Sequence, residues 1–134
     1  MIVLDASALL DVLLDQPDRG WVLDRLSGEH VCAPAHQLAE VLSAVARLVH
    51  AGEVDPAQAG TLVEEAAALQ QELVVPSAEH LRAALTLQAR VRVLDGLYVA
   101  LAQERGVPLV TSDRRLAGAQ LPVTVLIPDE PRPG

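Results

Sequence analysis

Two hydrophobic patterns alternate along this chain. Short apolar runs of three or four residues recur, and such runs are typical of strands buried in a parallel sheet. Longer stretches between them place apolar residues three and four positions apart, which is the period of an amphipathic helix. Residues 36–49 illustrate this period with Leu38, Val41, Leu42, Val45, Leu48 and Val49. The alternation predicts an α/β protein in which helices cover both faces of a parallel sheet.

Turn residues between these runs set the expected boundaries. Strands are predicted at residues 1–4, 31–33, 73–75, 109–111 and 124–127. Helices are predicted at residues 8–14, 19–26, 36–49, 56–71, 78–89, 95–105 and 114–119. Ser7, Asp55 and Ser77 are expected to cap the helices that follow them, and Gly106 is expected to end its helix. Residues 1–128 would form a single domain, and residues 129–134 would form a flexible tail because no apolar residue anchors them.

The composition narrows the class of protein. The chain is 51% hydrophobic and has no Phe, one Trp and one Tyr, so it offers no aromatic stacking platform for single-stranded nucleic acid. A net charge of −8 argues against a generally basic nucleic-acid binder. No apolar run approaches the ~20 residues of a membrane span, and no secretory signal is expected because Asp5 interrupts the N-terminal run. The single cysteine, Cys32, is expected to be a buried thiol in a cytoplasmic protein.

Four carboxylates stand where the local structure is expected to change. Asp5 and Asp113 follow predicted strands, Asp95 opens a predicted helix, and Glu40 lies early in another. In an open α/β sheet, strand ends and helix starts line the ligand crevice. Acids gathered there would repel one another, because two unit charges ~4 Å apart cost about 4 kcal/mol at an effective dielectric of ~20. A divalent cation would relieve this repulsion, which points to metal-assisted chemistry on a phosphate ester.

Each acid also has a simpler interpretation. Asp5, Asp95 and Asp113 each precede a predicted helix, where aspartate is a common N-cap. Glu40 lies away from the apolar stripe of its helix and could be an ordinary solvated side chain. Ser7 could hold Asp5 by a hydrogen bond or could merely cap. Three aspartates at three such junctions nevertheless favour a shared function for the set.

Four segments of the chain resemble a known family. They are residues 2–10 (IVLDASALL), 38–42 (LAEVL), 94–102 (LDGLYVALA) and 109–116 (LVTSDRRL). In this order and spacing the chain resembles a PIN-domain ribonuclease, and more narrowly a VapC-type toxin of a type II toxin–antitoxin system. Gly96 stands where the family most often has Ala or another small residue, a variation that could loosen the helix start without removing a ligand.

The resemblance implies a fold, a cofactor and partners. The fold would be a PIN-like three-layer α/β/α sandwich with a five-stranded parallel sheet. The cofactor would be Mg²⁺ or Mn²⁺, and the partners would be an RNA substrate, a cognate VapB-like antitoxin and a second copy in a homodimer. The family's acidic quartet falls on Asp5, Glu40, Asp95 and Asp113. Its supporting hydroxyls fall on Ser7, Thr111 and Ser112.

The implied activity is that of a metal-dependent endoribonuclease, in which a metal-activated water attacks the scissile phosphate. Asp5 and Asp95 would hold the ion, and Glu40 and Asp113 would hold its waters or a second ion. The main rival is a catalytically silent PIN-fold module that binds an antitoxin or RNA. Two other families with acidic clusters fit less well: a haloacid-dehalogenase-like phosphatase needs an acid at the position of Ser7, and a receiver domain needs a Lys, which this chain lacks.

RNA has to approach an acidic protein, so the basic residues beside the quartet matter. Arg114 and Arg115 directly follow Asp113 and are the candidates for phosphate contact. Weaker candidates, expected to be solvated surface charges, are Arg47, Arg82, Arg90 and Arg92. All four histidines are expected at the surface: His30, His36, His50 and His80. Substrate contact is an alternative for His36.

Partner contacts are expected on the helices near Trp21 and at residues 55–71. The second of these helices offers a modest apolar surface, made of Val63, Ala66, Ala67 and Leu69.

Overall fold

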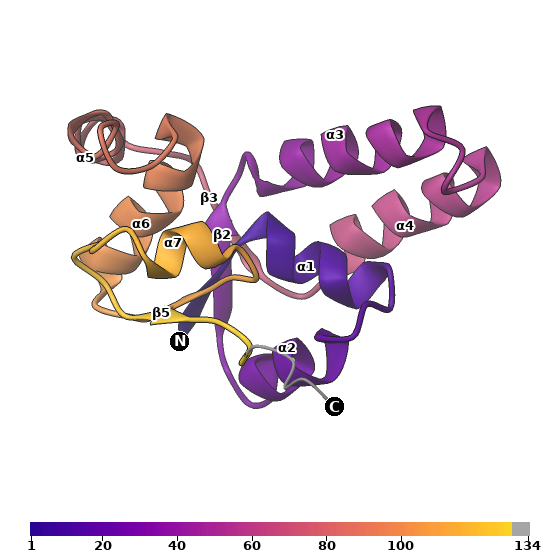
Figure 1. The fold of residues 1–134 in the computed structure, drawn as a ribbon. Helices are drawn as coiled ribbons and strands as arrows, with labels where there is room; N and C mark the ends of the chain where they lie inside the picture. The colour runs from indigo at the N-terminus through magenta and orange to yellow at the C-terminus, as the bar shows by residue number, and fades with distance from the viewer. Residues whose placement is uncertain (130–134) are drawn as a thin grey trace.

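The computed structural model describes residues 1–129 and is built around a five-stranded parallel sheet (Figure 1). The strands are β1 (Ile2–Leu4), β2 (Val31–Pro34), β3 (Glu72–Val74), β4 (Leu109–Val110) and β5 (Val125–Leu126). Their order is β3-β2-β1-β4-β5, so β1 lies at the centre, with Val3 opposite both Cys32 and Leu109. Each predicted strand is confirmed to within one residue at either end.

Seven helices within residues 1–129 cover this sheet. They are α1 (Ala6–Leu13), α2 (Arg19–Leu26), α3 (Gln37–His50), α4 (Pro56–Ala68), α5 (Ala78–Thr86), α6 (Val93–Arg105) and α7 (Arg114–Ala117). The chain runs outward from β1 to β3 and then returns across β1 to β4 and β5. Because parallel crossovers are right-handed, the helices before β3 lie on one face and those after it on the other. Helix α6 contacts β1, β2 and β4, and the α3–α4 hairpin extends away from the sheet as an arm (Figure 1).

Some predicted helix boundaries are wrong. Helix α4 ends at Ala68 rather than at residue 71, because the chain must extend to enter β3 at Glu72. Helix α5 ends at Thr86 rather than at residue 89, and residues 87–90 continue as tight turns, with Gln88 N–H donating to the Leu85 carbonyl.

The helix caps are partly as predicted. Asp55 and Ser77 each form a capping box at the start of α4 and α5, and Gly106 ends α6 with a φ of 64°. The cap predicted for Ser7 is wrong, because α1 begins at Ala6 and Ser7 lies inside its first turn. The capping alternative for Asp95 is also wrong, because Arg92 is the N-cap residue of α6.

The core consists mainly of Leu, Val and Ala, as the composition predicts, together with the fully buried Tyr98. Cys32 is buried between the strands. Residues 95–102 of α6 are all buried, which confirms that this helix is packed on most sides. Ala66 is also buried, so it does not belong to the apolar surface predicted on α4. None of the helices in residues 1–129 has the length and apolar character needed to span a bilayer. Apart from Asp129, the predicted tail lies outside the described residues.

Gly96 allows α5 to pack directly against the start of α6. A Cβ at this position would lie 3.0 Å from the Cα of Ala84 and 3.2 Å from its Cβ. The small residue therefore permits a close helix contact beside Asp95.

Replacing Gly96 with alanine should push α5 away from α6 and lower the free energy of unfolding by about 1–3 kcal/mol. Gly60→Ala in α4 is the matched control, because a Cβ there meets no atom within 4 Å. That change should stabilise the chain by about 0.5–1 kcal/mol through helix propensity. Urea unfolding of both variants measures the difference, and a stabilising effect of Gly96→Ala would contradict the tight contact.

Candidate functional site

The four acids singled out in the sequence lie around the carboxyl end of the central strand. Asp5 directly follows β1, and Asp113 follows β4 at the start of α7. Glu40 is in the first turn of α3, after β2, and Asp95 is in the first turn of α6. The neighbours of β1 are β2 on one side and β4 on the other, and this point of divergence is where open α/β sheets bind ligands.

Asp5 is held by two hydroxyl groups. Its side chain is buried, and its Oδ2 accepts hydrogen bonds from the Ser7 hydroxyl at 2.7 Å and the Thr111 hydroxyl at 2.6 Å. Because each hydroxyl has one proton and gives it to Asp5, the 3.1 Å separation of the Ser7 and Thr111 oxygens is a contact only. The side-chain hydrogen bonds from residues 1–129 all reach Oδ2, so Oδ1 is the oxygen available to a ligand.

The surroundings of Asp5 disfavour its ionised form. Burial raises the pKa of Asp5, and the hydrogen bonds from Thr111 and Ser7 offset only part of that increase. The negative charges of Asp95 and Glu40 raise the pKa further. A bound cation would favour the carboxylate, so the site has the electrostatic character that the sequence predicts.

The loop after β4 is tied to α1 through the same hydroxyls. Ser112 N–H donates to Ser7 Oγ at 3.1 Å, and Asp113 N–H donates to Thr111 Oγ1 at 3.0 Å. The Ser112 hydroxyl donates to the carboxylate of Asp11, a residue the sequence interpretation missed. The available signal was spacing, because Asp11 is four residues after Ser7 and therefore on the same face of α1. Ser112 thus supports the site through its backbone, while its side chain fixes the loop to α1.

Glu40 is not an ordinary solvated residue. Its Oε1 accepts a hydrogen bond from the Tyr98 hydroxyl at 2.7 Å and lies 3.2 Å from His36 Nε2, an ion-pair contact when His36 is protonated. Burial raises the pKa of Glu40, but the contacts with His36 and Tyr98, together with the charges of His36 and Arg92, hold the pKa below its usual value. Burial, with the charges of Asp5 and Glu40, raises the pKa of Tyr98, so its hydroxyl remains a donor.

Two of the four histidines depart from the surface positions expected of them. His36 packs edge-on against Tyr98, with ring centroids 4.9 Å apart, and also reaches the Leu94 carbonyl. His80 is 6% exposed, and its Nδ1 accepts the Ser77 N–H in the capping box of α5. The expectation fails because both histidines lie near a helix start that packs against α6.

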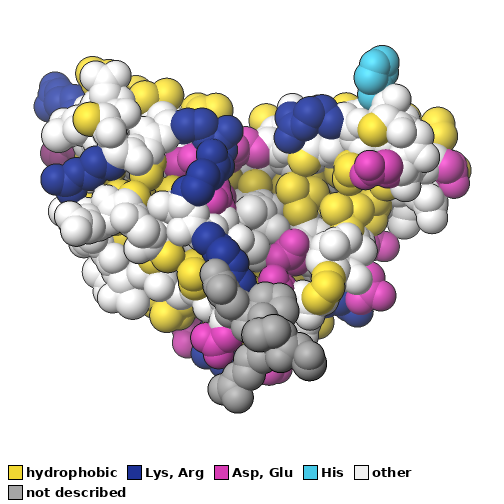
Figure 2. All heavy atoms as spheres, in the orientation of Figure 1, with side chains coloured by type: hydrophobic (Ala, Val, Ile, Leu, Met, Phe, Trp, Pro, Cys, Tyr) yellow, Lys and Arg dark blue, Asp and Glu magenta, His cyan; other side chains and the backbone are white. Residues whose placement is uncertain are grey.

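Asp95 and Asp113 each pair with an arginine. Arg92 Nε donates to Asp95 Oδ2 at 3.1 Å. Arg115 forms a two-pronged pair with Asp113, with Nε at 3.0 Å from Oδ1 and Nη2 at 2.6 Å from Oδ2. The hydrogen bond from Arg115 is the main reason that the pKa of Asp113 lies below its usual value. Figure 2 shows arginine side chains beside acidic ones near the notch between the α3–α4 arm and the rest of the molecule. The side chain of Arg92 is exposed, as expected of a solvated surface charge, but it also pairs with Asp95.

The structure brings the quartet together only in part. Asp95 and Glu40 lie within electrostatic reach of Asp5, and Asp113 is joined to Asp5 through Thr111. Within residues 1–129, however, no three acidic, histidine or cysteine side chains are close enough to bracket a metal ion. The carboxylate and hydroxyl oxygens suit a hard cation such as Mg²⁺ or Mn²⁺. Arg92 and Arg115 hold oxygens of Asp95 and Asp113 that a cation could otherwise bind, so the arginines compete with direct ligation.

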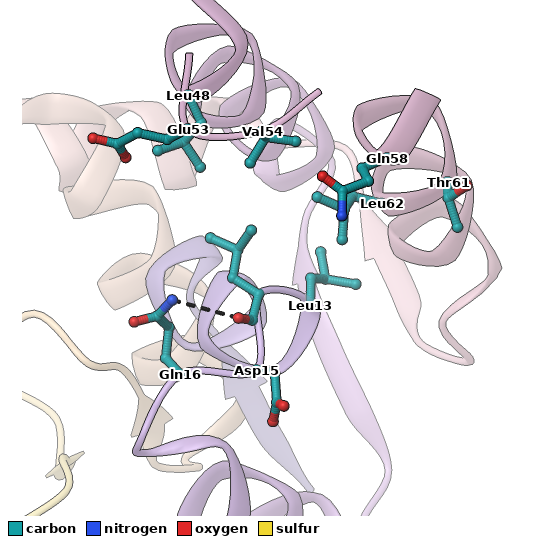
Figure 3. Close-up of a pocket in the computed structure, with 10 residues that line it drawn as sticks. Leu13, Asp15, Gln16, Leu48, Glu53, Val54, Gln58, Thr61 and Leu62 are labelled. Carbon is teal, nitrogen blue, oxygen red and sulfur yellow. Dashed lines mark hydrogen bonds between the residues drawn. The ribbon is translucent and has the colours of Figure 1, made fainter. Parts of the chain in front are cut away.

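A cavity of about 520 Å³ lies away from the four acids of the quartet, between the end of α1 and the α3–α4 hairpin (Figure 3). Leu13 from α1 faces Val54 and Leu62 from the hairpin across this cavity, with polar side chains at its rim (Figure 3). No member of the quartet lines it, so it is a surface separate from the acidic site.

This sheet, with acids at the carboxyl end of its central strand, is the arrangement that the sequence resemblance implies. Residues 2–120 match the PIN domain, and the chain belongs to the PIN domain family. It is 40% identical over 124 residues to Ribonuclease VapC3 of Mycobacterium tuberculosis, covering 88% of this chain and 86% of that protein. It is 39% identical over 117 residues to Ribonuclease VapC12 of the same organism, covering 87% of this chain and 90% of that protein. The resemblance to VapC proteins is therefore confirmed.

A solved structure shares the fold. The crystal structure of VapBC2 from Rickettsia felis, bound to a DNA fragment from their promoter, matches with a TM-score of 0.70. The match covers 95% of this chain and 98% of that chain at 16% sequence identity. The three-layer α/β fold expected from the sequence is thereby confirmed.

Proposed function

We propose that this chain is a Mg²⁺- or Mn²⁺-dependent endoribonuclease and the toxin of a toxin–antitoxin pair. The observation that carries the proposal is the buried Asp5, which has one oxygen fixed by two hydroxyls and its charge disfavoured by Asp95 and Glu40. The two relatives named Ribonuclease VapC, similar over most of their length, support the same activity.

In this proposal Asp5 and Asp95 hold the cation, and Glu40 and Asp113 complete the acidic surroundings. The cation, when bound, would lower the pKa of a water molecule and offset negative charge on the scissile phosphate. Side chains of the protein position the acids that would bind the cation. Ser7 and Thr111 fix Asp5 Oδ2 and so determine where Oδ1 points.

Two further groups of side chains have roles in this scheme. Tyr98 and His36 keep Glu40 ionised and immobile. Arg114 and Arg115, at the start of α7, bind the phosphates of the RNA strand.

The proposed partner is a VapB-like antitoxin. The apolar cavity between α1 and the α3–α4 hairpin is a suitable docking surface, since it is large and separate from the acids. The Rickettsia felis structure that shares this fold is an assembly named VapBC2. We further propose a homodimer and a cytoplasmic location, consistent with the exposed Leu81 and Leu85 on α5 and the reduced Cys32. Residues 1–128 would act as one domain followed by a short tail.

The second candidate is a catalytically silent module that binds an antitoxin or RNA. The pairing of Asp95 with Arg92 and of Asp113 with Arg115 favours it, because these pairs occupy the carboxylates a cation would use.

A cleavage assay separates the two candidates. The chain is purified with its co-expressed antitoxin, stripped of it, and incubated with total RNA in Mg²⁺, in Mn²⁺ or in EDTA. The nuclease should produce discrete cuts with either cation and none in EDTA. Intact RNA under all three conditions, with antitoxin binding retained, would support the silent module instead.

A further inference from the structure

A cluster of two ion pairs lies in one cavity at the mouth of the acidic site, which Arg90 also lines. The cavity has a volume of about 250 Å³ and is lined by Asp95, Asp113, Arg92 and Arg115, among others. Arg92 precedes α6 and Arg115 lies on α7, so two separate elements supply the positive charges. Two acids and two arginines give this cluster no net charge.

The two ion pairs influence each other. The hydrogen bond from Arg115 is the main cause of the low pKa of Asp113, and the charge of Arg92 lowers that pKa further. The hydrogen bond to Asp95 raises the pKa of Arg92, and the neighbouring charge of Arg115 opposes that increase. The charge of Asp95 in turn raises the pKa of Arg115. Each arginine therefore interacts with the carboxylate of the other pair, and the four groups form one electrostatic unit.

The arginine side chains are largely exposed, whereas the carboxylates are largely buried. The side chains of Arg92 and Arg115 are 67% and 72% exposed, but those of Asp95 and Asp113 are only 8% and 18% exposed. Ion pairs with an exposed partner are weak, because water competes for the charged groups. A long arginine stem can therefore carry its guanidinium to another anion while the carboxylate stays in place.

We propose that Arg92 and Arg115 exchange between two anions, the carboxylates of Asp95 and Asp113 and a phosphate of the RNA strand. Binding of a divalent cation at Asp95, with its water molecules at Asp113, releases the arginines, and the released guanidinium groups bind the phosphate of the RNA strand. A phosphodiester accepts a two-pronged guanidinium contact as a carboxylate does, so the same geometry serves both partners. This inference rests on the proposed function and adds Arg92 to its phosphate-binding residues.

A purely structural role for the arginines makes the opposite prediction. If Arg92 and Arg115 only held the two carboxylates in position for a cation, their removal would weaken cation binding. If they compete with the cation, their removal strengthens it. The direction of the change in cation affinity therefore separates the two roles.

The test measures Mn²⁺ and RNA binding by the full chain, stripped of antitoxin, for the wild type, Arg92→Gln, Arg115→Gln and the double variant. Free Mn²⁺ is followed by electron paramagnetic resonance. RNA binding is followed by the anisotropy of a fluorescent oligonucleotide that a gel shows to be intact. Arg90→Gln is the matched control, because Arg90 lines the same cavity and donates to the Gln120 carbonyl rather than to an acid. Circular dichroism confirms that each variant is folded.

Each single variant should bind Mn²⁺ about two- to fivefold more tightly than the wild type, the upper part of the range expected for losing an exposed ion pair. In the presence of Mn²⁺, each should bind RNA at least about fivefold more weakly, because a phosphate contact is lost. Arg90→Gln should change Mn²⁺ affinity by less than about twofold, since its charge contacts no carboxylate.

Unchanged or weaker Mn²⁺ binding in Arg92→Gln and Arg115→Gln would overturn the inference. So would equal tightening in Arg90→Gln, unaltered RNA binding, or an absence of Mn²⁺ binding throughout. The cleavage assay is a separate readout. If the chain cuts RNA but the variants show no change in Mn²⁺ affinity, the proposed function stands and this inference is wrong. If the variants show the expected changes in Mn²⁺ and RNA affinity but the chain does not cut RNA, the proposed function is wrong and the exchange stands.

Discussion

Replacing Asp5 with asparagine is expected to abolish RNA cleavage and, at neutral pH, to raise the stability of the folded chain. Asparagine has the same shape, and its carbonyl oxygen can still accept from Ser7 and Thr111. It carries no negative charge for a hard cation. We expect cleavage to fall at least about 100-fold, the scale seen when one principal charge-stabilising group is removed from an active site.

The gain in stability follows from the raised pKa of Asp5. Between the ordinary value of 3.8 and that raised pKa, the folded chain binds more protons than the unfolded chain, so stability falls as the pH increases. Above both pKa values, burial of the charged carboxylate lowers the free energy of unfolding by a constant amount, and asparagine avoids this penalty. The excess stability of Asp5→Asn should therefore be greatest above the raised pKa of Asp5 and disappear as the pH falls below 3.8.

Unfolding in urea with EDTA present measures this effect without the stabilisation that a bound cation would add. Asp24→Asn is the control, because Asp24 is exposed on α2, away from the site. It should leave cleavage intact and change stability by less than about 0.5 kcal/mol. Wild-type cleavage by Asp5→Asn would remove Asp5 from the catalytic site.

Replacing Thr111 with valine should produce the largest loss of stability among single substitutions at the site. Thr111 is fully buried, donates to Asp5 Oδ2 and accepts from Asp113 N–H. Valine fills the same space but leaves both partners without their hydrogen bonds, at an expected cost of about 2–4 kcal/mol. Because the hydrogen bond from Thr111 lowers the pKa of Asp5, its loss raises that pKa further. The destabilisation should therefore be greater at neutral pH than below 3.8.

Urea unfolding at the two pH values measures this difference. Thr124→Val, at an exposed position before β5, should change stability by less than about 0.5 kcal/mol. Thr111→Ser restores the hydroxyl and should recover most of the pH-dependent part of the loss. A loss of equal size at both pH values would show that the hydroxyl does not stabilise the ionised form of Asp5.

The strands and the acids that follow them could be predicted because their signals are local. A short apolar run followed by an aspartate, as at Asp5 and near Asp113, indicates a strand and its carboxyl end together. The burial of α6 could be predicted for the same reason, since it is apolar on nearly all sides. These features depend on neighbouring residues and not on how the chain crosses the sheet.

The contacts that define the site could not be predicted, because they join distant segments. The hydrogen bond from Tyr98 to Glu40 spans 58 positions, and the bond from Thr111 to Asp5 spans 106. The predicted start of α1 is wrong for a local reason. Ser is a residue type common at N-caps, but α1 already begins at Ala6, and the Ser7 hydroxyl donates to Asp5, two residues before it. Arg92 and Asp95 are close in the sequence, but nothing in the sequence indicates that Arg92 pairs with Asp95 in addition to being solvated.

Crystals of the stripped chain, soaked in MnCl₂ and measured at the manganese absorption edge, test most directly whether these carboxylates hold a cation. We predict an anomalous peak at the carboxyl end of β1, within about 2–2.5 Å of Asp5 Oδ1. The guanidinium of Arg92 should have moved away from Asp95, and the carboxylate of Asp95 should bind the ion. Crystals that show no anomalous peak beside Asp5, at a Mn²⁺ concentration that supports RNA cleavage in solution, would contradict the assignment of the site.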